Sequence, residues 1–174
     1  MDIDRNKFNI SGTEIRNDLS KNWDLLPDES KVHMKKRIIF MGPESVGKST
    51  MSKQLSYFFG CNDVIEWGRA HTMNKKITFD GISEIGSSQL KLEEDEALIS
   101  TNGILFCDTD LITTKTWSKL YFNDYPKWFD YSIPKSINKD DLFLLMTPEA
   151  DQVLIFFDNF ISRLRMYFPF FVFS

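Results

Sequence analysis

The segment 42–49 constrains this chain more than any other, because it reads GPESVGKS and matches the pattern Gly-x-x-x-x-Gly-Lys-Ser. An apolar run precedes it and a helical pattern follows, the context of a loop that holds phosphates on backbone N–H groups at a helix N-terminus. We expect Lys48 to reach the β- and γ-phosphates of a nucleoside triphosphate and Ser49 to offer its hydroxyl to Mg²⁺. The expected nucleotide-binding residues are Gly42, Glu44, Ser45, Val46, Gly47, Lys48, Ser49 and Thr50.

Apolar runs and helical patterns alternate along the chain after residue 35. The pattern predicts strands at 37–41, 64–67, 103–107 and 142–146, and helices at 48–59, 83–100 and 111–122. Farther on, it predicts a last helix at 153–168 and a fifth strand at 170–173. Strands that alternate with helices form a parallel sheet covered on both faces. The predicted fold is therefore α/β, a three-layer sandwich of the P-loop NTPase class that resembles nucleoside and nucleotide kinases.

Residues 1–35 are polar and are interpreted as a separate, short helical piece ahead of a P-loop domain at 36–174. Ser11 is expected to cap a helix, with Glu14 in the capping-box position. The basic cluster Lys35-Lys36-Arg37 follows directly. We interpret it as the solvated start of the first strand.

Composition argues against two classes of partner, nucleic acids and membranes. The net charge of -4 argues against nucleic acid, which would need a concentrated basic surface. The N-terminus is polar, and no apolar run reaches the roughly 18 residues of a membrane span, so we expect a cytoplasmic protein without a membrane partner. Cys61 and Cys107 lie far apart and form no metal-binding pattern.

Two carboxylates, Asp108 and Asp110, follow the strand predicted at 103–107. In open α/β sheets, ligands bind at the carboxyl ends of the strands, so we expect Asp108 to hold Mg²⁺ together with Ser49. The alternative is that both aspartates only cap the helix that begins at Leu111.

A GTPase is a possible interpretation of Asn138-Lys139-Asp140-Asp141, which matches the Asn-Lys-x-Asp base-recognition pattern. That pattern belongs at the carboxyl end of a strand, whereas this segment precedes the strand predicted at 142–146. No Asp-x-x-Gly follows the third predicted strand either. We therefore interpret the segment as a helix-to-strand loop.

The sequence Glu66-Trp67-Gly68-Arg69 ends the second predicted strand, on the same rim as Asp108. Glu66 could accept a proton from an attacking hydroxyl, and Arg69 could hold the charge of a transferring phosphate. Trp67 offers a flat face for a planar ring, above all a cationic one. The alternative is a surface ion pair beside a core tryptophan. The expected catalytic residues are Lys48, Glu66, Arg69 and Asp108.

Four segments, taken in order, resemble the ribosylnicotinamide kinase domain of the NadR-type bifunctional nicotinamide-nucleotide adenylyltransferase/ribosylnicotinamide kinase family. They read GPESVGKST at 42–50, EWGR at 66–69, FCDTDLITT at 106–114 and WSKLYF at 117–122. In addition, ISGTEIR at 10–16, with Trp23, resembles the signature that closes the adenylyltransferase domain of the same proteins.

The resemblance implies a kinase that uses ATP and Mg²⁺ to phosphorylate the 5′-hydroxyl of nicotinamide riboside, giving nicotinamide mononucleotide in NAD biosynthesis and salvage. It also implies that residues 1–35 are the end of an adenylyltransferase domain and a linker, that the chain is shortened at both ends, and that it does not transfer adenylyl groups. Either Glu66 or Asp108 would be the base. The implied substrate contacts are Glu66, Trp67, Asp110 and Trp117.

Two other functions stay open. The family's lid segment, Asp-Gly-x-Arg, corresponds to residues 151–160, where the sequence has no arginine. The chain could therefore bind ATP as a sensor or fragment without turnover. It could also be another nucleoside kinase, because one fold serves many substrates. The sequence leaves the oligomeric state open.

Overall fold

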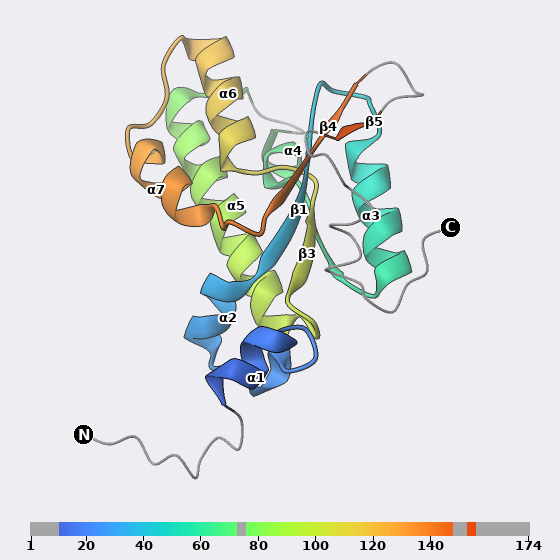
Figure 1. Cartoon of the computed structure of the whole chain (residues 1–174). Helices are drawn as coiled ribbons and strands as arrows, with labels where there is room; N and C mark the ends of the chain where they lie inside the picture. Colours follow the sequence, from blue (N-terminus) through green and yellow to red (C-terminus); the bar gives the residue numbers. More distant parts are fainter. Residues whose placement is uncertain (1–10, 73–75, 148–152, 156–174) are drawn as a thin grey trace, which may run out of the picture.

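The computed structural model describes residues 11–72, 76–147 and 153–155 (Figure 1). Its helices are α1 (Gly12–Asn17), the 3₁₀ turn η2 (Trp23–Leu25), α2 (Asp28–Met34), α3 (Lys48–Phe59), α4 (Trp67–Thr72), α5 (Phe79–Ile99), α6 (Leu111–Phe122) and α7 (Phe129–Ser136). Its strands are β1 (Lys36–Met41), β2 (Asn62–Val64), β3 (Ile104–Cys107), β4 (Leu142–Met146) and β5 (Val153–Ile155). Across the described ranges, no helix combines the length and the apolar character that a membrane crossing needs.

The five strands form one sheet in the order β2-β3-β1-β4-β5. β1 pairs in parallel with β3 and β4, and β2 pairs in parallel with β3, which confirms the predicted parallel sheet for these four strands. β5 runs antiparallel to β4, so the helix predicted at 153–168 is wrong at its start. The β-branched residues Val153 and Ile155 favour a strand, and the outer edge of β4 offers unpaired backbone groups. Residues 156–168 and the strand predicted at 170–173 lie outside the described part.

Side chains of the central strands alternate between two apolar clusters, because successive residues of a strand face opposite sides of the sheet. The face covered by α3 buries Ile38, Phe40, Ile104 and Phe106, and the face covered by α5 buries Ile39, Val64, Leu105 and Cys107. Figure 1 shows α3 and α5 on opposite sides of β1 and β3. Each such side chain contributes about 1.5–3 kcal/mol through burial, so the two clusters hold the three layers together.

The described part of the N-terminal segment packs on this same core. Trp23 is fully buried in the cluster under α5 and donates from Nε1 to the carbonyl of Ala97 at 3.3 Å. A Cβ on Gly103 would lie 2.3 Å from the indole, so Trp23 closes the end of the sheet where β3 begins. Ser11 and Glu14 form the predicted capping box of α1.

The basic cluster before β1 is not solvated as predicted, because Arg37 is 1% exposed. Its guanidinium lies 2.6 Å from Glu93 of α5 and 2.5 Å from Asp141 in the loop before β4. Burial works against the charged form, but the two carboxylates raise the pKa of Arg37 above its ordinary value. Long-range partners that the local sequence cannot reveal therefore turn a predicted surface residue into a buried, charged one.

The segment 138–141 lies between α7 and β4, as the sequence predicted. Asp141 accepts hydrogen bonds from the backbone N–H groups of Arg37 and Asn138, in addition to its contact with the guanidinium. The aspartate of the GTPase-like pattern thus belongs to the buried ion network, at the edge of the sheet where β1 begins.

Replacing Arg37 by methionine is expected to lower the free energy of unfolding by about 3–5 kcal/mol, because Glu93 and Asp141 would be left as buried charges without a cation. Urea denaturation followed by circular dichroism measures the loss. Lys139→Met removes one positive charge from an exposed position in the same loop and is expected to change stability by less than about 0.5 kcal/mol. Equal losses in the two variants would contradict the network.

Candidate functional site

The phosphate loop joins β1 to α3 through two glycines that the backbone requires. The φ angles are 137° at Gly42 and 89° at Gly47, in a range that residues with a side chain rarely adopt. A Cβ on Gly42 would also lie 2.3 Å from the carbonyl oxygen of Met146 in β4. The loop therefore leaves β1 in close contact with the neighbouring strand and turns directly into α3.

Two features of the loop attract anions. α3 begins at Lys48, and no side chain in the described part of the chain caps its first turn. Uncapped N–H groups at a helix N-terminus favour negative charge. The ammonium of Lys48 adds a full positive charge, and at present it donates to the loop carbonyls of Gly42 at 3.0 Å and Pro43 at 2.5 Å.

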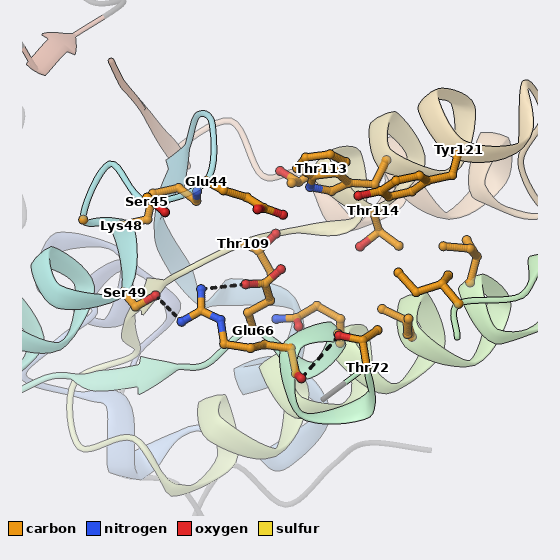
Figure 2. A pocket seen from close by; sticks show the side chains of 18 of the residues that line it. Glu44, Ser45, Lys48, Ser49, Glu66, Thr72, Thr109, Thr113, Thr114 and Tyr121 are labelled. Atoms are coloured by element: carbon orange, nitrogen blue, oxygen red, sulfur yellow. Dashed lines mark hydrogen bonds and ion pairs between the residues drawn. The ribbon is translucent and has the colours of Figure 1, made fainter. Parts of the chain in front are cut away.

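A pocket of about 630 Å³ extends from the loop toward α4, α5 and α6 (Figure 2). It brings together most of the residues predicted from the sequence, namely Glu44, Ser45, Gly47, Lys48, Ser49, Thr50, Glu66, Arg69 and Trp117. Five other predicted residues do not line it: Gly42, Val46, Trp67, Asp108 and Asp110. Gly42 shapes the loop instead, and Val46 packs against the apolar cluster under α3.

Glu66 and Arg69 meet at the middle of this pocket. The guanidinium of Arg69 donates to Glu66 Oε2 at 2.9 Å and to Ser49 Oγ at 2.8 Å, contacts that the dashed lines at Glu66 and Ser49 mark in Figure 2. It also lies 3.6 Å from Asp108 Oδ2. The predicted ion pair is present, but it faces the pocket and links it to the phosphate loop.

The two aspartates after β3 differ in what their oxygens contact. The Asp108 side chain is 5% exposed, and its Oδ1 is buried without a hydrogen-bond partner in the described part of the chain. Asp110 caps α6, because its Oδ1 accepts from the N–H and the hydroxyl of Thr113, each at 2.9 Å. Burial raises the pKa of Asp110, and the two hydrogen bonds oppose that rise. The capping alternative therefore describes Asp110, whereas Asp108 keeps a free oxygen.

No group of three His, Cys, Asp or Glu side chains within the described ranges is arranged around a metal position. A Mg²⁺ ion at this site would therefore depend on Asp108, the hydroxyl of Ser49 and oxygens from outside the protein. Magnesium accepts such a set, because it usually keeps waters and substrate phosphates among its ligands.

The second strand lies earlier than the predicted range 64–67, because β2 spans Asn62–Val64 and Trp67 begins α4. Gln89 of α5 accounts for the difference: its Oε1 accepts from the N–H of Trp67 at 2.9 Å, and its Nε2 donates to the carbonyl of Ile65 at 3.3 Å. The amide thus satisfies backbone groups that a strand would pair. From the sequence, no role was assigned to Gln89. A usable signal was its position, because Ile85, Gln89 and Glu93 are four residues apart and lie on the same buried face of α5.

The two tryptophans predicted to contact substrate have different positions. Trp117 lines the pocket and stacks on Tyr121, with ring centroids 5.5 Å apart and planes inclined by 15°. Ile82 and Ile85 of α5 also line the pocket. Trp67 is 37% exposed and does not line the pocket. The end of the pocket away from the phosphate loop is therefore aromatic and aliphatic, and Trp117 belongs to it.

A family model described as an AAA domain matches residues 37–158, which is most of this chain. The chain belongs to the AAA-domain family. Its similarity to known proteins also confirms the predicted resemblance to the NadR type. The trifunctional NAD biosynthesis/regulator proteins NadR of Salmonella typhimurium and Escherichia coli are 28% and 27% identical to it over 135 residues. Each alignment covers 70% of this chain and 31% of the relative.

Solved NadR structures share the fold. One NadR protein in complex with NR has a TM-score of 0.69 and 25% identity, and the match covers 96% of this chain and 47% of that one. A second, in complex with NAD and AMP-PNP, has a TM-score of 0.64 at 23% identity, over 96% and 49% of the two chains. These likenesses and the parallel sheet confirm the predicted P-loop NTPase-like fold. The chain spans about a third of the length of the curated relatives and about half of the solved ones.

Replacing Gly42 by alanine is expected to lower the free energy of unfolding by about 2–3 kcal/mol, because the new methyl group meets the Met146 carbonyl. Gly47→Ala is the matched control. Its φ is also positive, but apart from its two chain neighbours no atom of the described residues lies within 4 Å of the added Cβ, and its expected cost is about 1 kcal/mol. Urea denaturation of both variants measures the difference. Equal costs would argue against the close approach of β1 and β4.

Proposed function

We propose that this chain is an ATP- and Mg²⁺-dependent kinase that phosphorylates the 5′-hydroxyl of nicotinamide riboside to nicotinamide mononucleotide. The observation that carries the proposal is the continuous pocket with the phosphate loop at one end, Trp117 and Tyr121 at the other, and Glu66 with Arg69 between them. Such a pocket suits one molecule that brings phosphates and another that brings a planar ring. The NadR relatives, one of them solved in complex with NR, support this choice of acceptor.

At the phosphate end, the chain's own groups would bind and orient the triphosphate of ATP. The N–H groups of the loop and of the first turn of α3 would surround the phosphates. Lys48 would exchange the carbonyls of Gly42 and Pro43 for phosphate oxygens, because a fully charged partner outcompetes a neutral one. Gly42, Glu44, Ser45, Val46, Gly47 and Thr50 would complete the loop by their backbone or side-chain groups.

The residues present fit a Mg²⁺ ion beside these phosphates, because Asp108 has a buried oxygen without a partner among the described residues and Ser49 lies in the adjacent first turn of α3. Bound there, Mg²⁺ would supply neutralisation of the phosphate charge. Asp108 would contribute a carboxylate oxygen and Ser49 its hydroxyl oxygen. The protein would thereby fix the position of the transferring group.

Glu66 is the better candidate for the base that takes the proton of the 5′-hydroxyl. Its side chain is 28% exposed and lines the pocket, whereas that of Asp108 is 5% exposed and does not. A base has to reach the proton that it removes. Arg69, already in contact with Glu66, would stabilise the charge that develops on the transferring phosphate.

The aromatic end would bind the nicotinamide ring. The stacked rings of Trp117 and Tyr121 present a broad π surface, to which a pyridinium cation is attracted. Trp67 and Asp110 remain proposed substrate residues on the basis of the family resemblance, since neither lines the pocket. We further propose a cytoplasmic location and a division into residues 1–35, from an adenylyltransferase domain and linker, and residues 36–174.

The proposal is tested with purified protein, Mg²⁺-ATP and a panel of nucleosides, by following ADP release and the phosphorylated product. Release with nicotinamide riboside alone is the expected result, and Lys48→Ala is the control for contaminating kinases. ATP binding without release would favour a sensor or fragment that does not turn over. Release with a different nucleoside would favour another kinase of the same fold.

Replacing Glu66 by glutamine is expected to lower kcat by about 10²–10⁴-fold, the usual contribution of general acid–base catalysis, while the Kd for ATP stays within about threefold of the wild-type value. The reason is that glutamine keeps the shape of the side chain and loses the basic oxygen. Steady-state kinetics and calorimetry measure the two quantities. An unchanged kcat would remove Glu66 from the role of base and leave Asp108.

A further inference from the structure

Arg69 contacts oxygen-bearing side chains from three separate parts of the fold. Its guanidinium donates to Ser49 Oγ at 2.8 Å and to Glu66 Oε2 at 2.9 Å, and lies 3.6 Å from Asp108 Oδ2. Ser49 lies in the first turn of α3, Glu66 precedes α4, and Asp108 follows β3. Figure 2 shows Ser49 and Glu66 converging on the middle of the pocket. One cation of the protein therefore contacts all three elements.

Negative charge is concentrated at this point. Glu66 and Asp108 contact the guanidinium directly, and Asp63 of β2 is near enough to interact with Asp108. Burial raises the pKa of Asp63, and the charge of Asp108 adds to the rise. Lys48 faces the loop carbonyls. Within the described ranges, Arg69 is the only cationic side chain in contact with Glu66 and Asp108.

Two of these residues are the ones that the site would offer to Mg²⁺. Arg69 donates to the hydroxyl of Ser49 and lies 3.6 Å from Asp108 Oδ2, on the carboxylate whose other oxygen, Oδ1, has no hydrogen-bond partner in the described part of the chain. Magnesium binds oxygen at about 2.0–2.1 Å in a nearly octahedral arrangement, so a guanidinium that already donates to Ser49 Oγ crowds the position that the ion would take beside that atom. Two cations at one point also repel each other. Metal and Arg69 therefore compete for this position in the observed arrangement.

We propose that Arg69 occupies the divalent-cation position while the pocket holds no nucleotide, and that it suppresses metal binding until the metal arrives with a triphosphate. The inference rests on the nucleotide-binding part of the proposed function. The side chain of Arg69 is 58% exposed, so solvent screens its ion pairs and it can leave at small cost. Once displaced, the guanidinium is released beside the transferring phosphate, where the proposed chemistry needs it.

The test titrates Mn²⁺ into the whole chain without nucleotide. Electron paramagnetic resonance measures the concentration of unbound Mn²⁺ at each step. Wild-type protein is expected to bind Mn²⁺ weakly. Arg69→Gln and Arg69→Ala are each expected to bind it about tenfold more tightly, because the competing cation is gone. Adding Asp108→Asn to Arg69→Gln is expected to abolish the gain. With ATP present, the difference between wild type and Arg69→Gln is expected to shrink.

The control is Lys21→Gln, which removes one positive charge from an exposed position between α1 and η2 and is expected to match wild type. Equal Mn²⁺ affinity in wild type and in both Arg69 variants would overturn the inference, as would a gain that survives Asp108→Asn. No nucleoside is present in these titrations. A chain that binds ATP but fails to phosphorylate nicotinamide riboside would refute the proposed kinase activity and leave this result standing.

Discussion

The parallel pairing of β1 with β3 on one side and β4 on the other is the interaction on which the pocket depends. Because the three strands run in the same direction, their carboxyl ends bring the phosphate loop and Asp108 to one rim, with Met146 behind the loop. Glu66 follows β2 at the same rim. Residues that are far apart in sequence thus lie close together, because each directly follows a strand that ends at this rim.

The elements that could be predicted from the sequence are those whose signals are local. β1, β3 and β4 are short apolar runs, and the positive φ angles at Gly42 and Gly47 agree with a loop that must bend sharply. The caps of α1 and α6 follow from single polar side chains next to a helical pattern. Most of the predicted phosphate-loop residues line the pocket for the same reason, since eight consecutive positions define their geometry.

The features that could not be predicted depend on partners distant in sequence. Arg37 finds Glu93 and Asp141, which are 56 and 104 residues away, so no local pattern distinguishes it from a surface arginine. Gln89, 24 residues after Ile65, donates a hydrogen bond to the Ile65 carbonyl, and β2 ends before that residue. The formation of β5 as a strand depends on pairing with the edge of β4, and that edge exists only in the folded sheet, so the sequence of residues 153–155 alone does not reveal it.

The burial of Trp23 at the edge where β3 begins, and the position of Trp117 in the pocket, give the chain two built-in optical sensors. An indole sealed against Ala97 and Gly103 emits at short wavelength as long as the core is intact, and shifts to the red only when the core opens to water. An indole that lines the pocket can be quenched by a molecule that enters it. Once the other two tryptophans, Trp67 and Trp128, are replaced, fluorescence could follow unfolding and pocket occupancy in one sample, without an added label.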